Sequence, residues 1–200
     1  MEHSAVSTSA SPDAASCLAI LCTPERLRPL KDAPRGLKGL YALSDCHGRL
    51  RYIGMTAQDD FRQRINSRHV TGSEGNSHKF SCAYNVGRLW RGDEKRHPQQ
   101  IPSDAAIAKA LRTAFVRHFC KAAWVPLEVD PIDLGRLETA VIALAPSSMK
   151  DWNGTRVLAE PEPTDLLDAF LDKQAWPASQ ITAIERQASL FRAEVVRIGS

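Results

Sequence analysis

Residues 39–54 read GLYALSDCHGRLRYIG, and this stretch decides how the first half of the chain is interpreted. Two runs of alternating apolar and polar residues flank a polar centre that contains Gly48. Such runs, joined by a short polar turn, are typical of a β-hairpin. In a hairpin Tyr41 and Tyr52 lie near one another across the strand pair, so their side chains can contribute to one site.

The composition sets the class of protein. The chain has 200 residues, enough for one domain with extensions, and 43% of them are hydrophobic, which is ordinary for a globular protein. No run approaches the ~18 apolar residues of a membrane span. Residues 1–16 contain no Lys or Arg, and the apolar run 17–22 is too short for a signal peptide. We therefore expect a disordered leader over 1–16 and a cytoplasmic protein without a membrane partner.

The five cysteines include no C-x-x-C pair, which argues against a disulfide framework and against a zinc site. Basic side chains, in contrast, are concentrated. Residues 35–96 carry a net charge of +6, from twelve Lys and Arg against six Asp and Glu, whereas the whole chain carries +3. Nine of the twelve are arginines, whose guanidinium groups match phosphate oxygens bidentately.

This basic segment encloses both tyrosines, which favours a polyanionic ligand, although a basic block is also typical of a solvated face. The candidate side chains for contacts with such a ligand are Arg49, Arg51, Arg62, Arg68, His78, Lys79, Arg88 and Arg91.

Periodicity predicts helices and three strands, and hence an α+β fold. The strands are expected at about 38–44, 49–54 and 122–130, and Pro126 predicts that the third is an edge strand or carries a bulge, because proline cannot donate to a ladder. Apolar spacing and caps predict the helices. They are expected at about 24–30, 61–69, 77–90, 103–119, 134–145 and 179–196, with a short acidic helix from about 164.

The order of these motifs resembles the GIY-YIG nuclease superfamily over about residues 36–156. Gly39-Leu40-Tyr41 is similar to the first family motif and Tyr52-Ile53-Gly54 to the second. Phe61-x-x-Arg64-Ile65 resembles the helix that carries the family's catalytic arginine. The resemblance implies a small three-stranded antiparallel sheet flanked by helices.

Two further elements extend the resemblance. The strand and helix over 124–138 are similar to the segment that delivers the family's metal-binding glutamate, here Glu138, and Asn153 falls near the family's asparagine in the following loop. We therefore assign residues 17–156 to a nuclease domain with a helical insertion at about 70–122. Residues 157–200 form a helical C-terminal extension.

The resemblance implies metal-dependent hydrolysis of DNA phosphodiester bonds. Double-stranded DNA is then the expected partner, and the basic side chains named above are the candidate DNA-binding residues. Glu138 would hold Mg²⁺, with Mn²⁺ as a substitute, and Arg64 would neutralise charge that develops on the phosphate. Tyr41 would be the base, provided that nearby positive charge lowers its pKa from the usual ~10. Tyr52 would orient water or substrate. Asn153 would position the Glu138 or tyrosine side chains.

Two positions depart from the family's pattern. Met55 follows the second motif, where many members have a lysine, and this removes one cation that could lower a tyrosine pKa. Some restriction enzymes of the family carry a histidine four residues after the arginine; here Arg68 occupies that position and His69 follows. On an α-helix His69 would be rotated by about 140° from Arg64, so it reaches the site if the helix ends there. His78 is the competing histidine, and we choose His69.

The insertion at about 70–122 favours an endonuclease of restriction type, because elements added to a nuclease core usually supply the base contacts. One active site per chain then suggests a homodimer on a palindromic sequence. A repair-type structure-specific nuclease and a single-strand nuclease are alternatives. A DNA-binding module that has lost catalysis is an alternative of another class, against which the complete set of Tyr, Arg and Glu residues argues.

Overall fold

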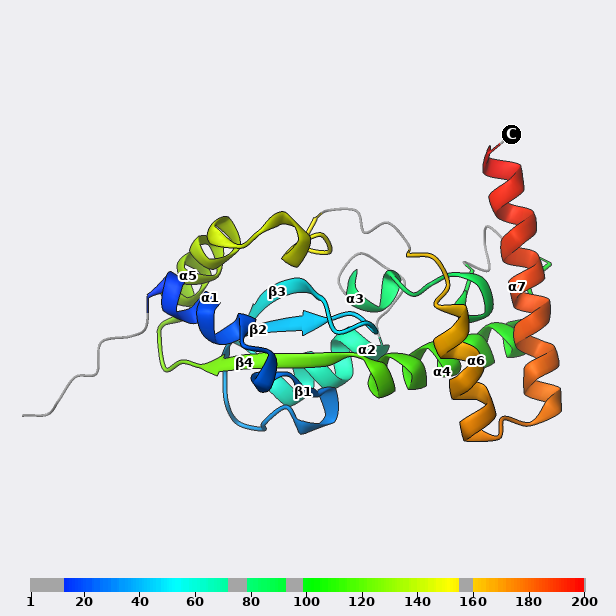
Figure 1. Cartoon of the computed structure of the whole chain (residues 1–200), viewed down its shortest axis with the longest axis horizontal. Helices are drawn as coiled ribbons and strands as arrows, with labels where there is room; N and C mark the ends of the chain where they lie inside the picture. The colour runs from blue at the N-terminus through cyan, green and yellow to red at the C-terminus, as the bar shows by residue number, and fades with distance from the viewer. Residues whose placement is uncertain (1–12, 72–78, 93–98, 155–159, 200) are drawn as a thin grey trace, which may run out of the picture.

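The structure, a computed structural model, describes residues 13–71, 79–92, 99–154 and 160–199. These residues form seven α-helices and one four-stranded antiparallel sheet, an α+β arrangement. The sheet lies toward one end of an elongated molecule, and helices α6 and α7 lie at the other end (Figure 1). His78 and residues 1–12 of the expected leader lie outside the described residues.

The predicted hairpin is formed by β2 (Gly39–Ser44) and β3 (Leu50–Thr56). Tyr41 pairs with Gly54, and Tyr52 pairs with Leu43. Residues that pair directly point to the same side of a sheet, so both tyrosines project from one face. A Cβ atom on Gly54 would lie 2.8 Å from the Tyr41 hydroxyl, so glycine at this position leaves room for the tyrosine ring.

The sheet has four strands rather than the three expected. Strand β4 (Lys121–Pro126) pairs with β2 on one side and with the two-residue strand β1 (Arg28–Pro29) on the other, which gives the order β1-β4-β2-β3. The prediction that β4 is an edge strand or carries a bulge was therefore wrong, because β4 lies inside the sheet and its register with β2 is regular. Pro126 is tolerated because β1 reaches only as far as Ala122, so no described strand faces the outer side of Pro126.

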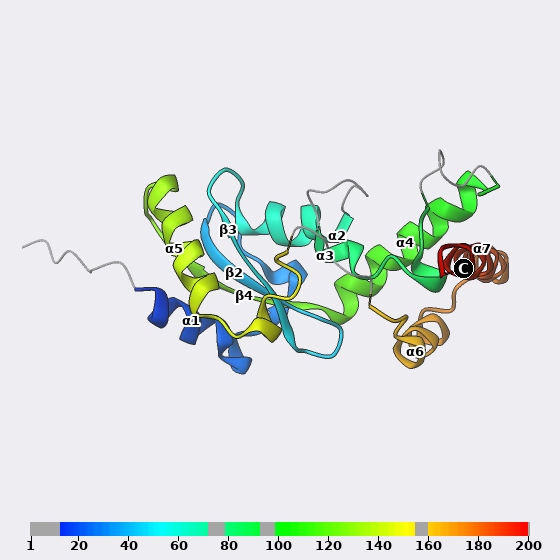
Figure 2. The same ribbon diagram turned by 90° about the horizontal axis from the view of Figure 1, so that it is seen from above.

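Helices α1 (Ala14–Cys22) and α5 (Pro131–Leu144) cover one face of the sheet (Figure 2). The carboxylate of Asp13 caps α1 by accepting the Ser16 N–H at 2.8 Å. Because α1 begins at Ala14, the boundary expected after residue 16 falls inside a helix. The buried side chains on this face include Cys17, Leu21, Leu40, Ala42, Ile53, Ala123, Val125, Leu134 and Val141.

The opposite face is covered by the π-helical segment η3 (Arg62–Arg68), α2 (His69–Thr71), α3 (Lys79–Cys82) and one end of α4 (Pro102–Phe119). The separation of the two cores follows the strand period of two, because alternate residues of β2 point to opposite faces. The buried side chains on this second face include Tyr41, Leu43, Phe61, Ile65, Phe80, Tyr84, Phe115 and Trp152.

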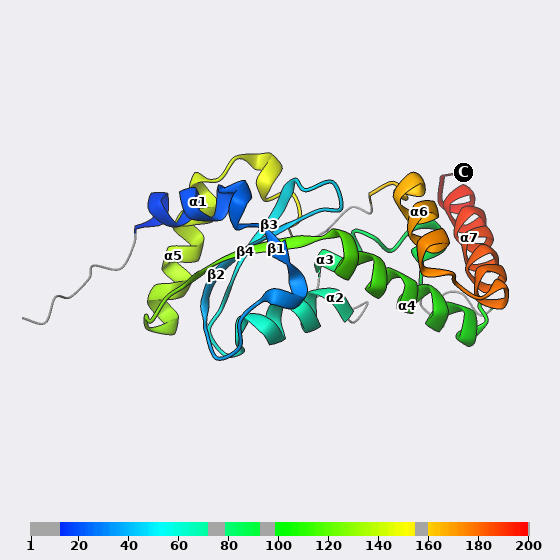
Figure 3. The ribbon, with the colours of Figure 1, turned by 60° about the horizontal axis from the view of Figure 1, so that its bottom comes forward.

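Helix α4 links the sheet to α6 (Thr164–Gln174) and α7 (Ala178–Gly199), the two helices expected in the C-terminal segment (Figure 3). Helix α7 packs on α4 and on η4 (Gly87–Leu89). None of the helices that the structure describes is long and apolar enough to cross a membrane.

Candidate active site

The backbone of η3 determines which side chains reach the tyrosines. The N–H of His69 donates to the carbonyl of Arg64, an i+5→i hydrogen bond. In an α-helix these two residues would be about 140° apart, whereas the wider π-helical turn brings residues five apart onto nearly the same side. Arg64 and His69 therefore both face Tyr41. The sequence predicted that the helix ends at about His69. Instead, the helix continues as α2.

The Tyr41 hydroxyl group lies among three polar side chains, those of Tyr52, Arg64 and His69. We call these four residues the tyrosine cluster. The hydroxyl oxygen lies 2.6 Å from His69 Nε2, and Arg64 Nε donates to the same oxygen at 3.1 Å. The ring of Tyr52 stacks on that of Tyr41, with centroids 6.1 Å apart. Since arginine can only donate, the Tyr41 oxygen accepts from Arg64. The Tyr41 proton bonds His69 Nε2 in the tautomer that leaves this nitrogen unprotonated.

The side chains of the tyrosine cluster differ from one another in their access to solvent. The side chains of Tyr41 and His69 are buried, whereas Tyr52 and Arg64 are half-buried. Burial raises the pKa of Tyr41 well above 10, Tyr52 raises it further, and Arg64 opposes the increase. The expectation that surrounding charge lowers this pKa is therefore wrong for the chain itself. Burial also raises the pKa of Tyr52, against the effect of Arg64. Both phenols are consequently neutral at neutral pH.

Glu138 belongs to α5, which covers the opposite face of the sheet, and it approaches the cluster across the edge strand β3. Its carboxyl is half-buried, and burial raises its pKa, while the backbone N–H of Met55 and the charge of Arg64 act in the opposite direction. The charge of Glu138 in turn acts on Tyr52. One carboxylate therefore lies in electrostatic contact with the arginine and with the more exposed phenol. Helix α5 starts before the expected cap at Asp133, because Asp130 caps it.

Asn153 closes the free edge of β3. Its Oδ1 accepts the N–H of Ile53 at 2.9 Å, and its Nδ2 donates to the carbonyl of the same residue. The neighbouring Trp152 N–H donates to the Arg51 carbonyl at 3.0 Å. This loop thus satisfies backbone groups that an edge strand would otherwise expose. Asn153 therefore positions the backbone of Ile53, the residue between Tyr52 and Gly54. It was expected to position the side chain of Glu138 or of a tyrosine instead.

Several arginines expected to bind DNA are paired with acids. Arg51 bonds Glu160 and lies over the Trp152 ring at 5.1 Å. Arg88 bonds Glu162 at 2.7 Å and Asp168 at 2.6 Å. The side chains of Arg51 and Arg88 are only 14% and 13% exposed, so their charges are largely neutralised within the chain.

The remaining candidates for DNA binding differ in their partners within the chain. Arg49 pairs with Asp45 at 3.0 Å, and Arg68 pairs with Asp59 at 2.9 Å, but both arginines are exposed. Arg62 forms no ion pair with any described residue. Lys79 opens α3, and the backbone N–H of Arg91 donates to the Asn85 side chain at 2.7 Å.

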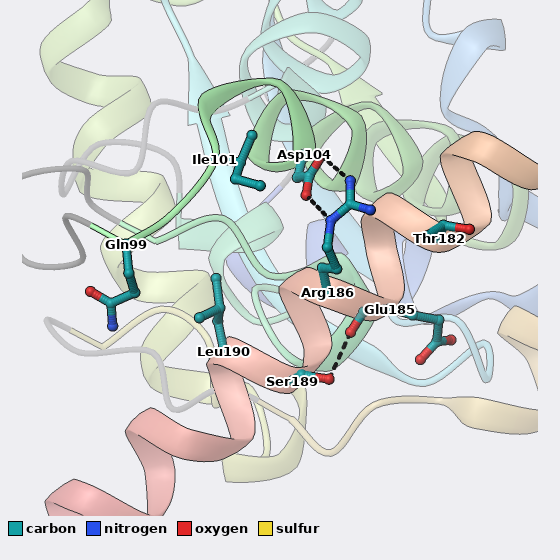
Figure 4. Close-up of a pocket in the computed structure, with 8 residues that line it drawn as sticks. All are labelled: Gln99, Ile101, Asp104, Thr182, Glu185, Arg186, Ser189 and Leu190. Carbon is teal, nitrogen blue, oxygen red and sulfur yellow. Dashed lines mark hydrogen bonds and ion pairs between the residues drawn. The ribbon is translucent and has the colours of Figure 1, made fainter.

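Two of the hollows outside the tyrosine cluster adjoin η3 and the C-terminal helices. A polar cleft beside η3 includes Arg35 and Asn66, which the motif analysis did not select although Arg35 belongs to the basic segment. Figure 4 shows the other, a groove of about 530 Å³ between α4 and α7. It is crossed by the ion pair of Arg186 with Asp104, at 2.7 Å, and none of the candidate catalytic residues lines it.

Among the residues that the structure describes, no group of three or more His, Cys, Asp or Glu side chains could hold a metal ion. Glu138 is the carboxylate whose charge acts on Arg64 and Tyr52 of the tyrosine cluster. No family model matches the sequence, and no curated protein or solved structure matches it. Any assignment of function therefore rests on the residues and on their geometry.

Proposed function

We propose that the chain is a metal-dependent endonuclease of the GIY-YIG type that hydrolyses DNA phosphodiester bonds. The observation that carries this proposal is the convergence of side chains from separate elements. Tyr41 comes from β2, Tyr52 from β3, and Arg64 and His69 from η3 and α2. Glu138 approaches from α5 across the sheet edge.

A buried Tyr–His hydrogen bond also occurs in ordinary cores, so the surroundings must decide between the two interpretations. Arg64 has no carboxylate within ion-pair distance among the described residues and instead donates to a phenol. The pKa of Glu138 is raised although Arg64 opposes the increase. Structural pairs normally neutralise one another, whereas a catalytic centre keeps charge available for the substrate. This arrangement supports a catalytic role.

The geometry suggests a division of labour in which Arg64 contacts the scissile phosphate and stabilises the charge that develops there. Tyr52 is the phenol that solvent can reach, so it contacts the attacking water. Tyr52 interacts by hydrogen bonding with Tyr41, whose hydroxyl meets His69 Nε2. The proton of the water therefore passes through the two phenols to His69. A neutral imidazole accepts a proton near pH 7 more readily than a phenol of raised pKa does.

Glu138 fits a site for one divalent cation. Mg²⁺ is usually held by one or two carboxylates, substrate phosphates and retained waters, and a half-buried carboxylate beside an arginine that faces the substrate supplies the protein's share. Mg²⁺, or Mn²⁺ as a substitute, would supply charge neutralisation at the scissile phosphate and at the leaving oxygen. Glu138 must be ionised for this purpose.

We infer double-stranded DNA as the substrate and restriction-type cleavage as the activity, because helical elements α3, η4 and α4 are added to the sheet and its flanking helices. One tyrosine cluster per chain would cut one strand at a time, so cleavage of both strands calls for a homodimer. Structure-specific, single-strand and catalytically inactive forms are separated by the experiment below.

Plasmid DNA incubated with the protein and Mg²⁺ should be cut, and EDTA should prevent cutting. Glu138→Ala should abolish cleavage because it removes the carboxylate, whereas Glu128→Ala, at an exposed acid before α5, should cut like the wild type. Discrete fragments on a gel support restriction-type cleavage. A smear contradicts sequence specificity, and cutting confined to single-stranded or branched substrates favours the corresponding alternative. Binding without cutting in Mg²⁺ and Mn²⁺ rejects the enzyme.

A further inference from the structure

A polar cleft of about 390 Å³ lies on the outer side of η3. It is formed by the loop before β2 and by the first turns of η3, where Arg62 N–H donates to the Pro34 carbonyl at 3.0 Å. The cleft is lined by Arg35, Asp60, Arg62, Gln63, Asn66 and Ser67. No apolar side chain is among them, so the cleft suits a polar ligand.

The two arginines of this cleft are not neutralised within the described chain. Arg35 is exposed and forms no ion pair there, and the same holds for the half-buried Arg62. The Nε of Arg62 is buried and has no hydrogen-bond partner among the described residues. A buried guanidinium donor without a partner is costly, so it indicates a missing acceptor.

The one acid in the cleft is already engaged. Asp60 accepts the N–H of Gln63 at 2.8 Å and the N–H of Gly36 at 2.9 Å. These bonds hold the pKa of Asp60 below its usual value, with a smaller contribution from Arg35. Asp60 therefore fixes the backbone of the cleft, and two arginines against one such carboxylate leave the cleft with net positive charge.

We propose that this cleft binds a backbone phosphate of the DNA strand that also carries the scissile phosphate. The inference rests on the proposed function, because η3 presents Arg64 to the tyrosine cluster and Arg62 to the cleft. A strand that contacts both arginines follows η3. Guanidinium forks and the amide and hydroxyl donors of Gln63 and Ser67 match phosphodiester oxygens, which fix register without reading sequence.

The test measures binding of a fluorescent 30-base-pair duplex in EDTA, where no cleavage occurs, over a series of salt concentrations. Removing one phosphate contact should lower the magnitude of the slope of log K against log salt by about 0.9. We expect this full change for the double variant Arg35→Ala/Arg62→Ala. Because both arginines contact one phosphate, each single variant keeps one arginine there and should lower the magnitude of the slope by a smaller amount. Arg192→Ala, at an exposed arginine of α7, is the charge-matched control.

An unchanged salt slope for Arg35→Ala overturns the proposal, even if the wild type cuts DNA. Arg35 is exposed, so this variant stays informative if Arg62→Ala does not fold. A wild type that binds the duplex through these arginines but never cuts supports the cleft and rejects the nuclease. If inorganic phosphate alone raises the melting temperature through Arg35 while duplex binding does not depend on it, the ligand is a free anion and the DNA assignment fails.

Discussion

Two polar clusters of this molecule contain the same residue types but differ in how the charges of their arginines are paired. The tyrosine cluster combines buried phenols with Arg64 and His69. A second cluster, which we call the ion-pair cluster, surrounds the segment 160–163 and contains Arg51, Tyr84, Arg88, Glu160 and Glu162. Each has a buried tyrosine and arginines with limited exposure. They differ in their acids, because every arginine of the ion-pair cluster bonds a carboxylate.

This difference separates structure from function better than residue type does. In the ion-pair cluster Arg88 bonds Glu162 through both its side chain and its backbone N–H, which holds the segment before α6 against η4. Each arginine of this cluster is therefore paired with a carboxylate of the same chain. In the tyrosine cluster Arg64 bonds a neutral phenol, so its charge is available to a phosphate.

The largest expected effect comes from replacing one arginine of each cluster with alanine. Arg64→Ala should reduce the cleavage rate by about 10³-fold or more, as for other arginines that stabilise phosphoryl transfer, with little change in the melting temperature. Arg88→Ala should keep the specific activity but lower the free energy of unfolding by about 2–3 kcal/mol, since it leaves Glu162 unpaired. Single-turnover cleavage and urea unfolding measure the two quantities. Equal activity losses in both variants would break the comparison.

A smaller effect is expected from the two buried tyrosines. Tyr41→Phe removes the oxygen between Arg64 and His69 and should slow cleavage by about 10²–10⁴-fold, the usual contribution of proton transfer. Tyr84→Phe is the matched control, because its hydroxyl bonds the backbone N–H of Cys46 at 2.8 Å and so serves the fold. This variant should lose about 1–2 kcal/mol of stability and keep its activity. Unchanged cleavage by Tyr41→Phe would rule out the proton path.

The sequence predicted those features that depend on local pattern. Alternation with period two predicted β2 and β3 and hence that Tyr41 and Tyr52 lie on one face. The apolar stripe of α5 predicted the helix that carries Glu138. The strand β1 was missed because two residues carry no period, and the edge position of β4 was wrong for the same reason.

Other features depend on contacts that no local pattern encodes. The partner of Arg51 is Glu160, which lies 109 residues further along the chain, so the basic segment was counted as one surface although part of it is neutralised. The position of His69 depends on an i+5→i backbone bond, whereas helical periodicity assumes i+4→i. Sequence reasoning therefore predicted which side chains lie close together better than it predicted their charge and orientation.

The smallest effect is on stability and concerns Glu138. It tests whether this acid is a structural partner of Arg64 or a carboxylate kept available for a cation. Burial raises the pKa of its carboxyl above the ordinary value of 4.5. A group whose pKa is higher in the folded state favours folding below its unfolded pKa, and this contribution is lost as the pH rises through the folded pKa. The charged carboxylate is therefore a net cost to the fold at neutral pH. Glu138→Gln should remove that cost together with the activity.

In EDTA, Glu138→Gln should therefore melt slightly above the wild type at pH 7, and the difference should vanish as the pH falls below about 4.5. Comparing the two proteins at each pH cancels the titration of all other groups. Mg²⁺ should then raise the melting temperature of the wild type alone, because a ligand stabilises the state that binds it. If Glu138→Gln is instead less stable at pH 7, Glu138 is a structural partner of Arg64, and the tyrosine cluster is neutralised in the same way as the ion-pair cluster.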